Sequence, residues 1–239
     1  MSKNDRIMRI VMSVVLIVAM VLWAGEVASL QTEYVWMGKA KTSYQTVKWR
    51  VVLDAGHGGK DPGKIGITGC YEKDINLKIV EKLKLFFEME GVEVILTRDG
   101  DYGLYQESDT NKKNADMRKR TKLIEDSKAD VLVSIHQNSY TDESIKGAQT
   151  FYYGGSTEGK QMAKSVQERM VLVLDKENHR KEKANDGYYL LKNSTCPSVI
   201  VECGFLSNEK ECSLLETEYY QEKVAWAIFV GIMQYLNTK

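Results

Sequence analysis

Three short apolar runs in the sequence each lead to a side chain that can bind a metal ion or carry a proton. The first run stops just before His57, the second ends at His136 and the third ends at Glu202. Runs of this length, rich in β-branched residues and bounded by turn residues, are typical of buried strands. Catalytic zinc is usually held by three side chains drawn from His, Glu, Asp and Cys, with water in the fourth position. The convergence of these groups therefore predicts an enzyme.

The third metal ligand should be a carboxylate close to one of the two histidines. Glu72 follows the glycine-rich loop after His57 and begins a predicted helix, so the loop can bring it back toward that histidine. Asp54 and Asp74 are rivals, but Asp54 lies within the strand and Asp74 lies one turn into the helix, where it favours the helix N-terminus. We therefore predict that one Zn²⁺ per chain is bound by His57, Glu72 and His136.

Glu202 is then left to carry protons. Zinc lowers the pKa of its bound water to about 7, and a nearby carboxylate can take the proton as the hydroxide attacks a carbonyl. The same carboxylate can return the proton to an amine, which leaves poorly unless it is protonated. A buried glutamate without a partner is costly, so packing does not explain Glu202. Asn138, two residues after His136, is a candidate for positioning the substrate.

Two further features have readier structural explanations. Gly58 to Lys64 fits the spacing GxxxxGK, but Ile65 follows where a phosphate-binding loop needs Ser or Thr to hold magnesium, and no helix begins there. The third histidine, His179, lies in a run of charged residues and is predicted to be a surface residue. Neither feature is assigned a function.

The composition indicates one ordinary globular domain with no excess charge. The chain has 239 residues, with 33 Lys and Arg against 33 Asp and Glu, so no nucleic-acid partner is predicted. The four cysteines are too few for a disulfide scaffold and have no CxxC spacing. We expect four thiols packed in or near the core. They are Cys70, Cys196, Cys203 and Cys212.

The N-terminus resembles a targeting segment. Three basic residues within the first nine precede an uncharged, mostly apolar stretch from Ile10 to Gly25. Positive charge before such a stretch predicts that the N-terminus stays inside and the rest is exported. The stretch is short for a spanning helix and long for a signal core, so a cleaved signal peptide and a membrane-contacting anchor both stay open. We expect a signal or anchor over 1–30, a linker over 31–48 and a catalytic domain over 49–239.

Strands and helices alternate through the exported part. The spacing of apolar residues predicts strands at 49–53, 92–97, 131–136, 148–153, 188–191 and 198–202, and helices at 73–90, 115–127, about 162–173, about 208–211 and 224–235. The polar stretch Asp99–Asn114 is predicted to be a mobile lid or a disordered loop. This alternation predicts an α/β fold with a mostly parallel sheet covered by helices on both faces. Ligands of such sheets bind beyond the C-terminal ends of the strands, where His57, His136 and Glu202 are expected.

Four sequence blocks around these residues match one known family in order and spacing. They are LDAGHGGKDPG at His57, YEKD at Glu72, SIHQNS at His136 and VECGFLSN at Glu202. The chain resembles the zinc-dependent N-acetylmuramoyl-L-alanine amidases from about Arg50 to its C-terminus. The resemblance implies a single twisted sheet, zinc bound by the two histidines and Glu72, and Glu202 as the catalytic carboxylate.

Within that family the chain most resembles the sporulation and germination branch. The cues are the block GAQTFYYG, a single catalytic domain, a short N-terminal membrane segment and the lack of wall-binding repeats. The resemblance implies removal of stem peptides from peptidoglycan in the spore cortex, outside the cytoplasm, between the membranes of a developing spore. This would be the first step toward muramic-δ-lactam, which a separate deacetylase completes. Whether an activating protein partner is needed stays open.

Two other functions remain to be distinguished from the amidase. A non-catalytic peptidoglycan-binding module would bind the wall without any chemistry, and the exchange Glu202→Gln would not affect it. An exported zinc peptidase would cleave peptides that carry no sugar.

Overall fold

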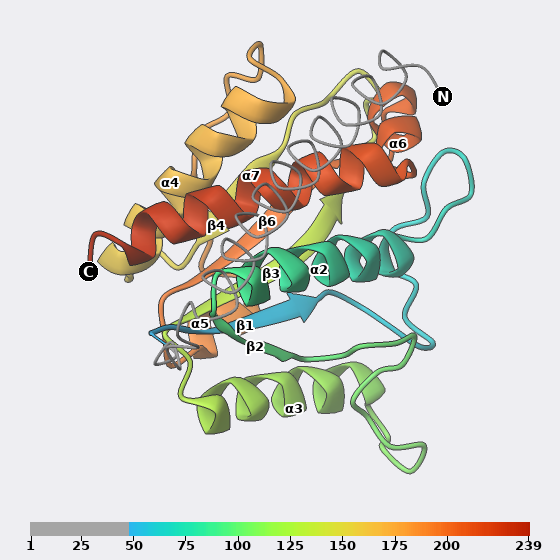
Figure 1. The fold of residues 1–239 in the computed structure, drawn as a ribbon. Coiled ribbons are helices and arrows are strands. Elements are labelled where there is room, and N and C mark those ends of the chain that lie inside the picture. Colours follow the sequence, from blue (N-terminus) through green and yellow to red (C-terminus); the bar gives the residue numbers. More distant parts are fainter. Residues whose placement is uncertain (1–47) are drawn as a thin grey trace, which may run out of the picture. The chain divides into compact units, whose positions relative to one another are not determined.

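The computed structural model describes residues 48–239, which form one six-stranded sheet with helices on both faces (Figure 1). The predicted targeting segment and nearly all of the predicted linker lie outside the described residues. Within the described part, no helix is long and apolar enough to span a bilayer. The strands are β1 (Arg50–Ala55), β2 (Glu93–Leu96), β3 (Val131–Asn138), β4 (Gln149–Tyr152), β5 (Lys183–Ala184) and β6 (Ser198–Phe205). The helices are α2 (Glu72–Met89), α3 (Lys112–Ser127), α4 (Thr157–Leu174), α5 (Tyr189–Asn193), α6 (Glu209–Leu215) and α7 (Glu218–Leu236).

The strand order is β2-β1-β3-β6-β4-β5, and β4 against β6 is the antiparallel pair in a sheet whose other pairs are parallel. The mostly parallel α/β sheet predicted from the sequence is confirmed. Because β1, β3 and β6 run in the same direction, their C-terminal ends meet at one edge of the sheet. That edge is where the three apolar runs deliver their polar side chains.

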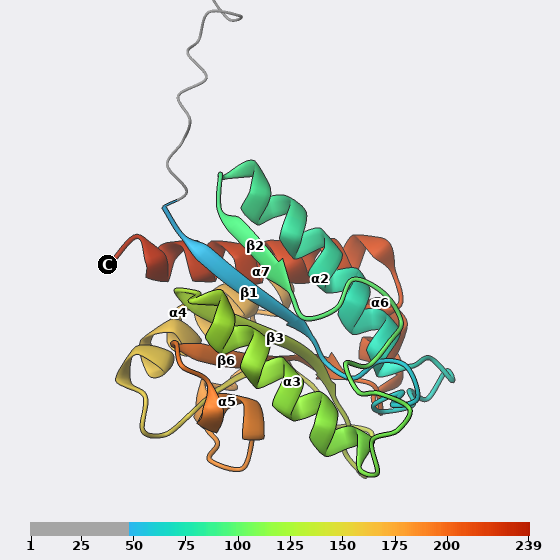
Figure 2. The ribbon, with the colours of Figure 1, turned by 90° about the horizontal axis from the view of Figure 1, so that it is seen from below.

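Side chains of the central strands alternate between two apolar layers. Val51 and Leu53 pack in the larger core under α2, α4 and α7, whereas Val52 packs on the other face with Ile124 of α3 and Leu190, which belongs to α5. Figure 2, seen from below, shows α3 and α5 in front of the sheet and α7 behind it. Both faces are therefore covered, as expected for strands with apolar residues at successive positions.

The predicted strand Tyr188–Leu191 is wrong, because Tyr189–Asn193 form the short helix α5. Leu190 packs with Ile124, and Leu191 packs with Ile200, on the same face of the sheet. Successive residues of a strand point to opposite faces, so a strand could not bury both leucines there. One helical turn allows it.

The charged segment 175–186 contains a short strand that was not predicted, because the segment is polar. Lys183–Ala184 pair with β4 at the edge of the sheet, and both residues are exposed. Short, charged edge strands are common because they discourage pairing with other chains. Such a strand lacks the apolar alternation by which strands are predicted.

The polar stretch Asp99–Asn114 consists of a loop and the first turn of α3, whose start the prediction placed three residues too late, at 115. The helix begins at Lys112, because the Asn111 side chain accepts a hydrogen bond from the amide of Asn114. The loop itself contacts the glycine-rich loop after β1, since the amide of Gly59 donates a hydrogen bond to Asp101 Oδ1 at 2.8 Å.

Candidate metal centre

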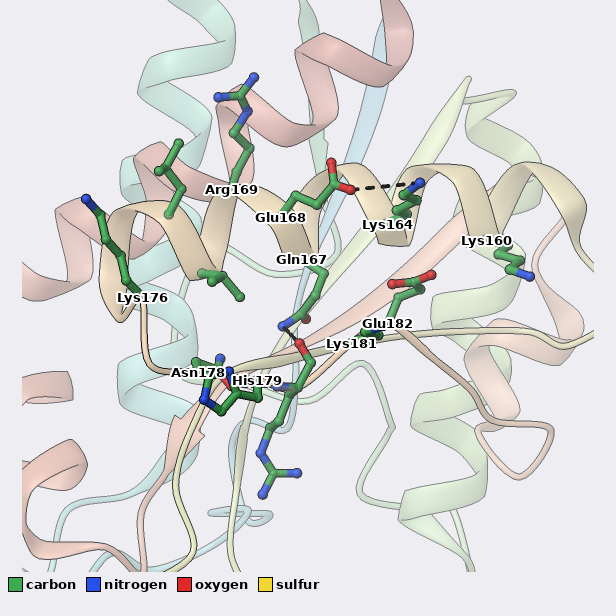
Figure 3. Close-up of a pocket in the computed structure, with 13 residues that line it drawn as sticks. Lys160, Lys164, Gln167, Glu168, Arg169, Lys176, Asn178, His179, Lys181 and Glu182 are labelled. Carbon is green, nitrogen blue, oxygen red and sulfur yellow. Dashed lines mark hydrogen bonds and ion pairs between the residues drawn. The ribbon is translucent and has the colours of Figure 1, made fainter.

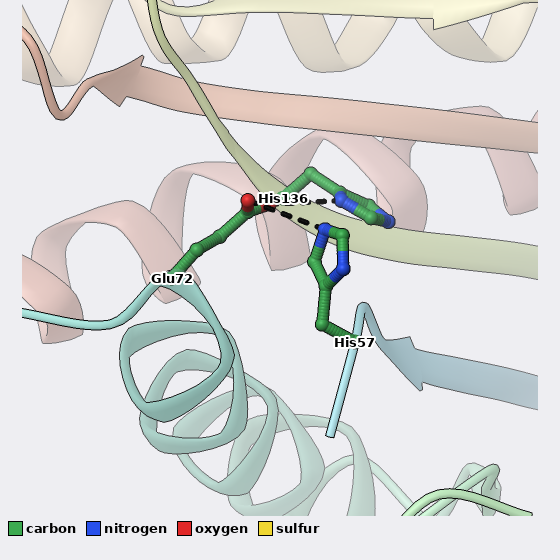
Figure 4. A group of neighbouring side chains, drawn as sticks. All are labelled: His57, Glu72 and His136. Carbon is green, nitrogen blue, oxygen red and sulfur yellow. Dashed lines mark hydrogen bonds and ion pairs between the residues drawn. The ribbon is translucent and has the colours of Figure 1, made fainter. Parts of the chain in front are cut away.

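His57, Glu72 and His136 converge at the C-terminal edge of the sheet, with their side chains pointing toward one another (Figure 4). Glu72 Oε2 lies 3.2 Å from His57 Nε2, and Glu72 Oε1 lies 2.9 Å from His136 Nδ1. One nitrogen or oxygen atom from each of the three residues can be chosen so that all lie within 4.8 Å of one another. Two imidazoles and one carboxylate at this spacing could hold a metal ion.

His57 has a backbone conformation that few side chains adopt. It lies just after β1 with φ of 64°, in the left-handed region, where non-glycine residues are uncommon. The Arg120 guanidinium donates to the His57 carbonyl at 2.7 Å and holds this peptide in place. Strained backbone of this kind collects at functional sites when the surrounding structure enforces it.

Glu72 is fixed by backbone amides from two directions. The amide of Lys64 donates to Oε2 at 2.8 Å, and the amide of Gln137 donates to Oε1 at 3.0 Å. Burial alone would raise the pKa of Glu72, which is 2% exposed, but hydrogen bonds and charges from both histidines hold the pKa well below its usual range. Glu72 is therefore an ionised carboxylate, the form that binds metals.

The glycine-rich loop approaches Glu72 so closely that it needs a glycine at position 63. Gly63 has φ of 69°, and a Cβ there would lie 2.5 Å from Glu72 Oε2 and 2.7 Å from His57 Cδ2. Any larger residue would displace two of the three clustered side chains.

Asp61 is a member of the site that the sequence interpretation missed. Its Oδ2 atom lies 2.9 Å from His57 Nδ1, on the far side of the ring from Glu72. Burial lowers the pKa of His57, but Asp61 and Glu72 outweigh it and raise the pKa to about 9. Carboxylates behind metal-binding histidines orient the ring in this way. The sequence feature that could have identified Asp61 is its position as an acidic residue four places after His57.

Glu202 lies on β6 directly beside His136 of β3, since the two are Cα partners in the sheet. It is 7% exposed, and its Oε1 accepts a hydrogen bond from the Tyr188 hydroxyl at 3.1 Å. Its Oε2 is buried without a hydrogen-bond partner among residues 48–239. Burial raises the pKa of Glu202 and the nearby charge of Glu72 adds to this, whereas His136 opposes it. Tyr188 was missed because its segment was predicted to be a strand.

The two rival carboxylates lie outside the cluster. Asp54 is paired with Arg120, whose Nη1 lies 2.6 Å from Oδ1, and accepts further hydrogen bonds from Ser134 and Thr97. Burial raises the pKa of Asp54, but Arg120 and these hydroxyls outweigh it and lower the pKa to about 2. Asp74 lines a separate small pocket together with Cys70 and Glu216.

Replacing Asp54 with alanine is expected to lower the free energy of unfolding by about 3–5 kcal/mol, because the Arg120 guanidinium would stay buried without its partner. Since the folded pKa lies below the unfolded value of about 3.9, this stability is complete above about pH 4 and is lost as the pH falls toward 2. Urea denaturation at several pH values would measure both effects. Asp126→Ala, which removes an exposed ion pair with Lys122, is the control and should leave the midpoint unchanged. Equal effects of the two exchanges would contradict the prediction.

The cluster opens into a cavity of about 790 Å³, which Asn138, Tyr188 and Glu202 also line. A larger groove of about 1040 Å³ lies between α4 and the segment 176–182 (Figure 3). Six of its thirteen lining residues are lysine or arginine, the exposed His179 also lines it, and it contains no cluster of metal-binding side chains from the described residues. We therefore place the chemistry in the smaller cavity, because two histidines and two glutamates line it together.

Comparison with known proteins agrees with the geometry. Residues 51–234 match the sequence profile of the family described as N-acetylmuramoyl-L-alanine amidase. The chain is 38% identical over 192 residues to the germination-specific N-acetylmuramoyl-L-alanine amidase of Bacillus subtilis (strain 168), covering 79% of this chain and 80% of that protein.

Solved structures show the same likeness. The CwlD amidase from Clostridioides difficile, solved in complex with the GerS lipoprotein, has a TM-score of 0.78 and 46% identity, covering 80% of this chain and 100% of that chain. The amidase AmiC2 of Nostoc punctiforme has a TM-score of 0.69 and 33% identity, covering 80% of this chain and 98% of that chain. The resemblance found in the four sequence blocks is confirmed, as is the likeness to the germination branch. The chain belongs to the N-acetylmuramoyl-L-alanine amidase family.

Proposed function

We propose that this chain hydrolyses the amide bond between the lactyl group of N-acetylmuramic acid and the L-alanine of the stem peptide. The observation that carries the proposal is the cluster of His57, Glu72 and His136, which shares one cavity with Glu202. One oxygen of Glu202 has no hydrogen-bond partner within the described part of the chain. Amide hydrolysis needs an activated water and a group that moves its proton to the leaving amine. The cluster and Glu202 fit these two requirements.

The donor set fits zinc. Two histidines and a glutamate are a known ligand set of catalytic zinc, Glu72 is ionised, and Asp61 orients the His57 ring. We assign one Zn²⁺ per chain to His57, Glu72 and His136. Bound zinc supplies a water of lowered pKa and polarises the scissile carbonyl.

Glu202 moves the proton in this proposal. The Tyr188 hydroxyl occupies Oε1 and holds the carboxylate in one orientation, while Oε2 is free to accept a proton from water and to donate it to the amine. Burial raises the pKa of Glu202, which favours uptake of the proton by this carboxylate as water attacks the carbonyl. Asn138 lines the same cavity and is assigned to positioning the substrate.

The relatives suggest where the reaction takes place. One is germination-specific, and another was solved with a lipoprotein. We therefore assign the chain to spore cortex peptidoglycan outside the cytoplasm, where removal of stem peptides is the first step toward muramic-δ-lactam. Residues 1–30 serve as signal or anchor, 31–48 as a linker and 49–239 as the catalytic domain. The proposal includes a lipoprotein partner that binds this chain and activates it.

Mass spectrometry of purified peptidoglycan, after incubation with the full chain and zinc, tests the function. Release of intact stem peptides that begin at L-alanine, with whole sugar chains, is expected. A matched peptide without muramic acid serves as the control. Its cleavage would indicate a general zinc peptidase, whereas binding to the wall without release, even with the partner lipoprotein present, would indicate a binding module.

Replacing Asp61 with alanine is expected to weaken zinc affinity about 10–100-fold, because the His57 ring would lose the carboxylate that orients it. Competition with a zinc-binding dye measures the affinity. Asp142→Ala is the matched control, since Asp142 is an exposed acidic residue whose carboxylate accepts hydrogen bonds from the nearby Ser144. An affinity for zinc that is unchanged in the Asp61 variant would contradict the role assigned to this carboxylate.

A further inference from the structure

We propose that Cys70 and Cys212 form a disulfide bond that fastens the loop before Glu72 to helix α6. Their Sγ atoms lie 3.5 Å apart although the residues are 142 positions apart in the sequence. Cys70 stands two residues before Glu72, and Cys212 lies in the middle of α6. A bond between them would join the end of the glycine-rich loop to the larger core.

The loop is shaped around the two sulfur atoms. A Cβ on Gly66 would lie 2.5 Å from Cys70 Sγ and 2.8 Å from Cys212 Sγ, so the sulfurs fill the space that a side chain would take. The Gly66 amide donates to the Cys70 carbonyl at 2.8 Å, and the Ile67 amide donates to the Leu206 carbonyl at 3.0 Å. The second of these bonds ties the loop to the turn that precedes α6. Bond formation would need the sulfurs to approach by about 1.5 Å, to the usual disulfide length of about 2.05 Å.

An oxidant can reach one of the two thiols. Cys70 is half-buried and lines a surface pocket of about 250 Å³, whereas Cys212 is fully buried. The Cys70 thiolate attacks a low-molecular-weight disulfide such as glutathione disulfide, which forms a mixed disulfide and releases one thiol. The Cys212 thiolate then attacks Cys70 Sγ, and the second thiol leaves. Two cysteines are oxidised, and the small disulfide is reduced to two thiols.

A metal ion is the competing occupant of these thiols. Cys70, Cys212 and Glu216 offer ligand atoms within 4.8 Å of one another. Structural zinc sites almost always have four protein ligands, whereas this group offers three, of which the Glu216 carboxylate is exposed. The contact between the sulfurs therefore favours the disulfide, which is also the stable form outside the cytoplasm.

The test uses the full zinc-loaded chain in a glutathione redox buffer. Oxidation should remove the mass of two hydrogen atoms and give a peptide pair linked through Cys70 and Cys212. It should also raise the melting temperature by about 5 °C or more, because the bond closes a long loop of the unfolded chain. A reductant should reverse both changes. The exchange Cys70→Ser should abolish both the linked peptide pair and the rise in melting temperature. The control exchange Cys196→Ser, at another half-buried cysteine, should leave both unchanged.

Two results would overturn the proposal. One is a folded chain in which Cys70 carries glutathione but never links to Cys212. The other is a second equivalent of zinc that disappears in the Cys70→Ser variant. Hydrolysis of peptidoglycan by the reduced enzyme is a separate readout, so failure of the disulfide leaves the amidase proposal intact.

Discussion

Glu202→Gln is expected to lower kcat about 10²–10⁴-fold while leaving one zinc ion bound per chain. Glutamine keeps the size of the side chain, and its carbonyl can still accept the hydrogen bond from the Tyr188 hydroxyl. The amide cannot take a proton from water or return it to the amine. Release of stem peptides from peptidoglycan and metal analysis of the same preparation measure the two quantities together.

Glu211 provides a matched control for this exchange. It is also a buried glutamate, but both of its oxygens accept backbone hydrogen bonds, from Gly147 at 2.9 Å and from Phe205 at 2.8 Å. Glu211→Gln is expected to lower stability and to retain kcat in the folded fraction. If Glu202→Gln retained full activity, the proton-transfer role of Glu202 would be wrong. If both variants lost activity equally, the loss in Glu202→Gln would be explained by impaired folding.

Replacing both His57 and His136 with alanine is expected to reduce bound zinc from one ion per chain to none and to abolish hydrolysis. Glu72 would be the remaining member of the cluster, and a single carboxylate does not retain zinc against a chelator. Metal analysis after dialysis measures the loss. His179→Ala is the control, because the chain has three histidines and the third is exposed. Stoichiometric zinc in the double variant would disprove the assigned site.

The elements that could be predicted from the sequence are those whose pattern of apolar residues matches the way the folded element is buried. The runs that became β1, β3 and β6 are apolar on both faces, and a central parallel strand is buried on both faces. The placement of His57, His136 and Glu202 follows from this arrangement, because parallel strands end at the same edge. Glu72 could be placed because it follows the glycine-rich loop, and that loop can fold back and bring the start of the next helix close to His57.

The parts that could not be predicted depend on contacts between distant segments. Tyr188 reaches Glu202 only because α5 folds over the sheet to bury two adjacent leucines, and strand propensity hides that turn. Asp54 was set aside as a ligand because it lies within the strand, but its partner Arg120, 66 residues away, could not be predicted. Cys70 and Cys212 have no shared motif, and the fold alone brings them together. Side-chain partners at such separations leave no local signal.

His136 on β3 and Glu202 on β6 are neighbours across the sheet. Hydrolytic activity therefore depends on the register in which these two strands pair. A slip of one residue between two strands turns every side chain of the slipped strand to the opposite face. Such a slip would move Glu202 away from the cavity while leaving the amount of helix and strand almost the same. Circular dichroism would therefore not distinguish a slipped sheet from the native one. Turnover of peptidoglycan would make the distinction, and it should be the quality test for any redesigned variant of this chain.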